Sequence, residues 1–121
     1  MNIFETVYTD LNVSGVNSVV NDISPYVRGR KKDMPAVLIE VPTQDFDRLS
    51  TGVYRTLSSV SLTCIARSVN EAEEVAEAVM TAVIDNNCNV INSVSRDYEE
   101  GYDDDSVGTF LVTIDYTNFG G

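Results

Sequence analysis

The chain has 121 residues, with 19 acidic and 8 basic side chains and a formal net charge of −11. This length suits one domain spanning residues 1–121, and a hydrophobic content of 43% is typical of a folded globular protein. The acidic balance argues against general nucleic-acid binding, because a strongly negative surface repels phosphates. Histidine is absent, which excludes Ser-His-Asp and Cys-His catalysis and histidine-ligated metal sites.

Two cysteines, Cys64 and Cys88, are too few for an all-cysteine zinc site and lack the spacing of a CxxC redox motif. One disulfide between them stays open in principle. The first residues lack the basic and apolar regions of a signal peptide, and no apolar run is long enough to span a membrane. We therefore expect synthesis in a reducing cytoplasm.

The first predicted element is a short helix capped by Asn2, with Glu5 placed to complete a capping box. Its apolar side chains recur at helical spacing, at Ile3, Phe4, Val7, Tyr8 and Leu11. After an interruption at 14–15, the same spacing predicts a second helical turn from Val16, Val19, Val20 and Ile23. Pro25 ends that pattern, and residues 26–27 begin an extended segment.

Two strands are predicted after a basic loop at residues 28–32. The first, 36–41, lies between two prolines, and the polar stretch 43–52 reads as an exposed hairpin connection. The second strand, 53–67, alternates in its later half. One side carries Val60, Leu62, Cys64 and Ala66, and the other carries Ser59, Ser61 and Thr63.

The strongest pattern is a helix that Asn70 caps, with Glu73 completing the capping box and 86–87 ending the helix. Its apolar face is Ala72, Val75, Ala76, Val79, Met80, Val83 and Ile84. Four glutamates lie in the first two turns, where the helix dipole favours acids: Glu71, Glu73, Glu74 and Glu77. We expect this face to pack on the long strand and on the last strand.

The C-terminal part predicts a hairpin. Its first strand, 89–98, is expected to place Val90, Val94 and Tyr98 on one side. The acidic tip is 97–105, and the return strand, 108–116, carries Phe110, Val112, Ile114 and Tyr116 on one face. Residues 118–121 are expected to form a loose tail. The order α-β-β-β-α-β-β predicts an α+β fold, with a mostly antiparallel sheet and helices packed on one face.

Two charged segments allow several interpretations. The six carboxylates of 97–105 form a solvated hairpin tip, a protein contact or a calcium site, although their spacing is not that of an EF-hand. The basic loop 28–32 holds four of the eight bases and is either a solvated connection or a binding segment for a phosphate chain, an anionic lipid surface or an acidic protein surface. We favour the acidic protein, because the rest of the chain is strongly acidic and the loop has no aromatic residue to stack bases.

Motifs for catalysis or cofactor binding are missing from the sequence, since neither GxxxxGK[ST] nor GxGxxG occurs. The carboxylates cluster in segments predicted to be exposed, where nothing raises a pKa. Cys64 is predicted to be a small core residue. We expect no enzymatic activity, no cofactor and no bound metal.

The passage from the long strand into the helix, Arg67-Ser68-Val69-Asn70-Glu71-Ala72, resembles a polar turn of the tail-completion (tail-terminator) proteins of long-tailed bacteriophages. The element order over residues 3–117 is also similar to theirs, including a strand preceded by a proline, here 35–39. The resemblance implies a structural virion protein of the tail or neck, present in the host cytoplasm during assembly. Such proteins form a homo-oligomeric ring, usually a hexamer. The ring caps the tail tube and meets the head-side connector, and DNA passes through without being gripped.

In such a ring, opposite charges on neighbouring subunits would set the register of assembly. The basic interface candidates are Arg28, Arg30, Lys31 and Lys32. The acidic candidates are Asp103, Asp104, Asp105, Glu73, Glu74 and Glu77. Two alternatives stay open: a ferredoxin-like ligand-binding or regulatory module, which needs an apolar pocket, and a small hydrolase that uses paired carboxylates.

Overall fold

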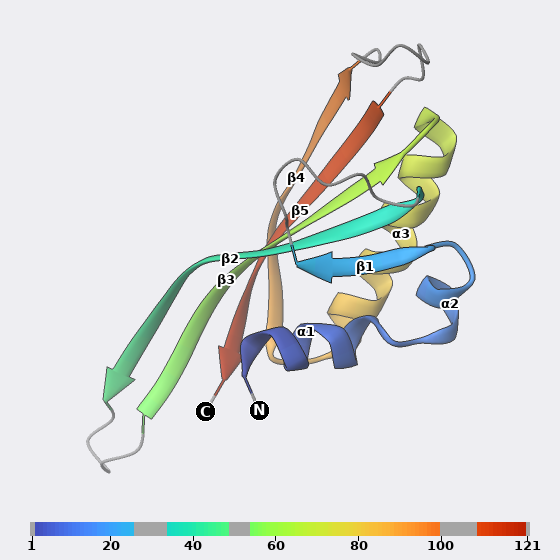
Figure 1. Cartoon of the computed structure of the whole chain (residues 1–121). Helices are drawn as coiled ribbons and strands as arrows, with labels where there is room; N and C mark the ends of the chain where they lie inside the picture. Colours follow the sequence, from blue (N-terminus) through green and yellow to red (C-terminus); the bar gives the residue numbers. More distant parts are fainter. Residues whose placement is uncertain (1, 26–33, 49–53, 100–108, 121) are drawn as a thin grey trace.

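The computed structural model describes residues 2–25, 34–48, 54–99 and 109–120. In these ranges the strands form one sheet in the order β1-β2-β3-β5-β4, and α3 lies across one face of it (Figure 1). The elements are α1 (Ile3–Leu11), α2 (Ser14–Asn17), β1 (Asp22–Pro25), β2 (Ala36–Arg48), β3 (Tyr54–Ala66), α3 (Val69–Asp85), β4 (Asn89–Glu99) and β5 (Thr109–Gly120). No described helix is long and apolar enough to cross a membrane.

The predicted α+β class is confirmed, and the sheet is largely antiparallel as expected. It is nevertheless mixed, because β1 pairs with β2 in parallel, whereas β2 with β3, β3 with β5 and β4 with β5 are antiparallel. The observed order, α-α-β-β-β-α-β-β, also differs in detail from the predicted one, since α2 is a separate helix.

The N-terminal helix has the predicted cap, because the Asn2 side chain accepts a hydrogen bond from the Glu5 amide at 3.0 Å. The second helical turn was placed too late in the sequence. α2 begins at Ser14, where an interruption was expected, and Ile23 lies in β1. Just before β1, the Asn21 backbone amide donates a hydrogen bond to the Pro35 carbonyl at 2.8 Å, and from Asp22 onward the chain pairs with β2. Pairing with β2 therefore makes the segment around Ile23 a strand, although its apolar residues have helical spacing.

β2 runs on to Arg48, so the predicted hairpin connection is wrong for residues 43–48, while 49–53 lie outside the described residues. The strand passes Pro42 by way of a register shift between Glu40 and Thr43. Proline lacks an N–H donor and is tolerated at a bulge or on an edge. The β1 pairing ends at Ile39, so this part of β2 has no β1 partner.

The core lies between α3 and the sheet, as predicted. Buried side chains of α3 meet those of β3 and β5, namely Val75, Val79, Val83, Val60, Leu62, Cys64, Val112 and Ile114. Met80 and Phe110 are only partly buried against this cluster. Ile84 was wrongly assigned to the apolar face, because it is 62% exposed and Ala82 is buried in its place.

α3 begins at Val69 with Ser68 as its N-cap, so the prediction of Asn70 is wrong. The Ser68 hydroxyl accepts a hydrogen bond from the Glu71 amide at 3.2 Å, and the Glu71 carboxylate accepts one from the Arg67 amide at 3.3 Å. Glu71, rather than Glu73, therefore completes the cap. The helix ends at Asp85 with Asn86 as C-cap, as predicted.

The predicted side assignment of β4 is wrong in part. A register shift between Ile91 and Ser93 changes which side chains share a face. Ile91 and Val94 pack against the core, whereas Val90 is 51% exposed. A bulge adds one residue to a strand and so reverses the alternation on either side of it. The side chain of Tyr98 lies outside the described part of the chain.

The expected loose tail is wrong for residues 118–120, because β5 continues to Gly120. Asn118 is buried and its amide donates to the Asn89 side-chain oxygen at 2.6 Å. The Phe119 backbone amide donates to the Cys88 carbonyl at 2.7 Å. These bonds hold the last residues beside the start of β4.

Candidate functional site

In the described ranges, no group of three or more His, Cys, Asp or Glu side chains is arranged to hold a metal ion. Both cysteines are free; Cys88 is exposed and Cys64 is buried. Burial raises the pKa of the Cys64 thiol to about 12. The thiol is therefore protonated at neutral pH, in agreement with its predicted place in the core.

A polar network around Asp10 accounts for several asparagines that the sequence analysis left without a role. The Asp10 carboxylate accepts hydrogen bonds from the side-chain amides of Asn86 and Asn89, both at 3.0 Å. Asn89 also donates to the Val83 carbonyl at 3.0 Å and accepts from Asn118. The network joins α1 to the α3–β4 turn and to β5.

Beside this network, the Tyr116 hydroxyl is buried and has no hydrogen-bond partner among the described residues. Burial, with a smaller contribution from the charge of Asp10, raises the pKa of Tyr116. Tyr116 is therefore a neutral core side chain rather than a proton donor at neutral pH.

The charged residues of α3 are all acidic, and their side chains have different surroundings in the structure. Glu71 takes part in the N-cap. Glu73 forms an ion pair with Arg96 of β4, with Arg96 Nε 2.5 Å from Glu73 Oε1 and Nη2 3.1 Å from Oε2. Glu74, Glu77 and Asp85 are exposed and lie along a groove beside the helix.

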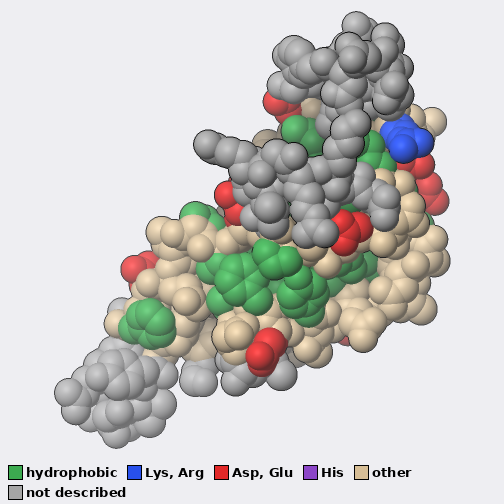
Figure 2. Space-filling model, in the orientation of Figure 1, with side chains coloured by type: hydrophobic (Ala, Val, Ile, Leu, Met, Phe, Trp, Pro, Cys, Tyr) green, Lys and Arg blue, Asp and Glu red, His purple; other side chains and the backbone are tan. Residues whose placement is uncertain are grey.

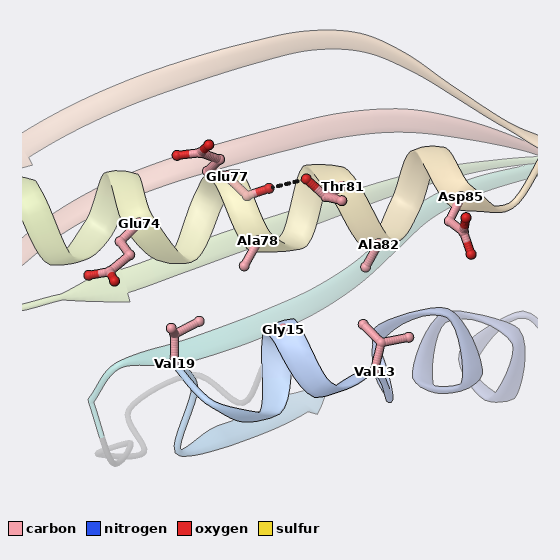
Figure 3. Close-up of a pocket in the computed structure, with 9 residues that line it drawn as sticks. All are labelled: Val13, Gly15, Val19, Glu74, Glu77, Ala78, Thr81, Ala82 and Asp85. Carbon is pink, nitrogen blue, oxygen red and sulfur yellow. Dashed lines mark hydrogen bonds between the residues drawn. The ribbon is translucent and has the colours of Figure 1, made fainter.

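This groove, of about 490 Å³, lies between α3 and the segment 13–19 around α2 (Figure 3). Apolar side chains line it from both sides, those of Val13, Val19, Ala78 and Ala82. A Cβ atom added at Gly15 would meet nothing within 4 Å, so the groove is open at this point. Glu74, Glu77, Thr81 and Asp85 complete its lining, with the Glu77 carboxylate directed to the side of α3 away from α2 (Figure 3). The groove thus combines an apolar floor with an acidic rim, which is chemistry suited to a cationic segment with apolar stems.

A second exposed feature is the far end of β2 and β3, which extends beyond the other strands as a two-stranded arm (Figure 1). The β5 pairing reaches only to Thr56 of β3. Phe46, at the base of this arm opposite Thr56, is 65% exposed and lines a hollow of about 730 Å³ together with Phe4 of α1. Two-stranded hairpins are marginally stable alone. An arm with an exposed aromatic ring is therefore a candidate contact with another molecule.

The space-filling view shows hydrophobic side chains at the centre of one face, with acidic side chains scattered around them (Figure 2). Of the interface residues predicted from sequence, the structure describes only Glu73, Glu74 and Glu77, and it brings the last two to the groove. The others lie outside the described residues: Arg28, Arg30, Lys31, Lys32, Asp103, Asp104 and Asp105.

The sequence analysis missed Asp85 and the apolar floor of the groove. The helix side of the groove could have been predicted from the sequence, because its residues recur at spacings of three and four and so share one side of the helix: 74, 77, 78, 81, 82 and 85. The opposite wall, at Val13 and Val19, could not be predicted from the sequence pattern, because its position depends on where α2 packs.

No protein-family model and no curated protein matches the chain. Among solved structures, the chain is similar to one from the virion of a native gene transfer agent particle. The TM-score is 0.57 and the sequence identity 11%, and the match covers 95% of this chain and 92% of that chain. The two chains share their fold over nearly their whole length.

Proposed function

We propose that this chain is a structural protein of a phage-like particle that forms a ring, caps the tail tube and joins it to the head-side connector. The observation that carries the proposal is the fold shared along almost the full chain with a component of a gene transfer agent virion. The element order and the segment Arg67–Ala72, which forms the N-cap and first turn of α3, resemble those of tail-completion proteins and narrow the proposed role to the tail end of the particle.

The proposed role requires neither catalysis nor a cofactor. In the described ranges the carboxylates of α3 that do not serve a cap or an ion pair are exposed, and no metal cluster occurs there. The Cys64 thiol is buried and protonated. The exposure of these carboxylates therefore favours a role in assembly over hydrolysis by paired carboxylates.

The sheet face opposite the helices suits a wall that DNA passes. At its centre it carries short polar side chains on β3 and β5, which bond to one another, whereas Arg55, Leu57 and Ile65 of β3 lie on the same face to either side. The Ser61 hydroxyl donates to the Asp115 carboxylate, and the Thr63 and Thr113 hydroxyls lie 3.5 Å apart. The cluster of hydroxyls and a carboxylate at the centre of this face would repel phosphates rather than bind them, which supports a surface that DNA passes.

A ring needs each subunit to present two different surfaces to its two neighbours. The arm with Phe46 and the groove beside α3 supply apolar contact area, and the interface charges predicted from the sequence would set the register. A ferredoxin-like module is less well supported, because that fold has the order β-α-β-β-α-β and this chain does not.

The proposed tail role is tested with the tail-tube protein of the same particle, polymerised with and without this chain. We expect addition of the chain to stop tube growth, so that tubes seen by electron microscopy become short and carry a ring at one end. A variant that folds but stays monomeric serves as the control. Tubes of unchanged length with no ring at their ends would contradict the proposed capping function.

A further inference from the structure

We propose that the groove between α2 and α3 is the docking site for the basic segment Arg28–Lys32 of a neighbouring copy of this chain. The inference rests on the proposed ring and identifies which two of its surfaces meet.

Among the described residues, α3 carries acidic side chains that take part in neither its N-cap nor its ion pair. Its charged side chains are all acidic, and two of them already have roles, since Glu71 bonds the Arg67 amide and Glu73 pairs with Arg96. The remaining three, Glu74, Glu77 and Asp85, all line the groove. The acids of the helix are therefore concentrated at the groove.

The position of Asp85 strengthens this argument. Asp85 is the last residue of α3, which has no basic side chain in its last turn. The C-terminal end of a helix carries a partial negative charge, so a carboxylate there is unfavourable unless a cation lies nearby. A cationic side chain in the groove would compensate both the carboxylate and the helix end.

The floor of the groove fits the stems of long basic side chains. Val13 is 37% exposed, and Val19, Ala78 and Ala82 contribute further apolar surface (Figure 3). Lys and Arg bury their methylene stems on such surface while their charged ends remain at the rim. In this arrangement the stems cover the floor and the charged ends reach the carboxylates.

The occupant follows from charge complementarity. Four of the eight basic residues of the chain lie in the five positions 28–32. Of the bases outside this segment, Arg96 is paired with Glu73. Each copy supplies one segment and one groove, so the same contact can repeat around a closed ring and satisfy every copy.

The direct test is disulfide trapping between two differently tagged copies that are co-expressed, both with Cys88→Ser. One copy carries Lys31→Cys and the other Thr81→Cys, an exposed position in the groove. The matched control replaces Thr81→Cys by Ile84→Cys, which lies on the same helix, is 62% exposed and does not line the groove. We expect the mixed-tag disulfide from the Lys31–Thr81 combination at ten times or more the yield of the control.

Equal yields from the two combinations would overturn the proposal. It would also fail if a double variant, Lys31→Cys with Thr81→Cys in one chain, closed a disulfide within the monomer while the mixed copies did not link. A ring that forms without the mixed-tag disulfide refutes this docking alone. A wild-type chain that stays monomeric refutes the ring and the docking together.

A second test removes charge from the groove without changing side-chain size. Glu74→Gln with Glu77→Gln should raise the dissociation constant of the oligomer about tenfold. The control, Glu40→Gln with Asp97→Asn, makes the same change in net charge at two exposed positions of the sheet. An equal effect of both pairs would mean that net charge, rather than the groove, governs assembly, and would contradict the proposal.

Discussion

Glu73 of α3 and Arg96 of β4 form a two-point ion pair that ties the helix to the edge strand of the sheet. The next residue on the helix, Glu74, lies at the groove instead. Two adjacent glutamates that the sequence treats alike therefore have different roles: one is used within the chain and the other faces outward.

This difference predicts the effect of Glu73→Gln. Both side chains of the ion pair are more than a third exposed, at 37% for Glu73 and 44% for Arg96, so solvent screens the pair. We expect a loss of unfolding free energy of less than about 1 kcal/mol in urea denaturation. The oligomer mass should not change, and a shift to monomer would place Glu73 in the subunit contact.

The helix-on-sheet core is tested by Val79→Asp. Val79 is fully buried between α3 and the sheet, so an aspartate there would be an unpaired charge in an apolar environment. We expect a loss of several kcal/mol of unfolding free energy. The matched control is Ile84→Asp on the exposed side of the same helix, which should cost less than about 1 kcal/mol. A melting temperature that Val79→Asp leaves unmoved would show that the helix face is wrongly assigned.

Tyr116→Phe tests the buried hydroxyl. In the described part of the chain this hydroxyl has no hydrogen-bond partner, so removing it deletes a desolvated polar group at almost no cost in packing. The variant should be as stable as the wild type or more stable by up to about 1 kcal/mol in chemical denaturation. A clear loss of stability would mean that the hydroxyl does bond to a partner.

Phe46→Ala tests the arm. Since Phe46 is 65% exposed, its loss should change the stability of the monomer by no more than about 0.5 kcal/mol. If the arm contacts a neighbouring subunit, the dissociation constant of the oligomer should rise about tenfold in analytical ultracentrifugation. Phe119→Ala, at a phenylalanine of β5 that is 41% exposed, is the control. Oligomers unaffected by Phe46→Ala would exclude the arm from the interface.

Much of the fold follows from periodicity alone. The buried faces of β5, of the later half of β3 and, apart from Ile84 and Ala82, of α3 were predictable because the apolar side chains keep one period there. The errors arise where the period is interrupted. The bulge after Ile91 reverses the alternation in β4, and the bulge at Pro42 lets β2 continue where a proline suggested an end.

The predicted start of α3 was wrong for a different reason. Ser68 and Asn70 are each followed three residues later by a glutamate, so the capping pattern fits both, and only the packed structure selects Ser68. Only part of the candidate site, its acidic helix residues, was predictable from the sequence. Glu74 and Glu77 were found as charges on a helix, whereas the groove that they border depends on the docking of α2, which no local pattern encodes.

We propose that the chain assembles into a ring whose register depends in part on charge. The most direct measurement is the oligomer mass of the wild type and of the variant Arg30→Glu, Lys31→Glu, Lys32→Glu, each at low and at high salt. We expect a wild-type ring of about 80 kDa, for six subunits of 13.3 kDa, that weakens as salt rises. The variant should be a folded monomer. A wild-type chain that is monomeric at every concentration and salt would contradict the account.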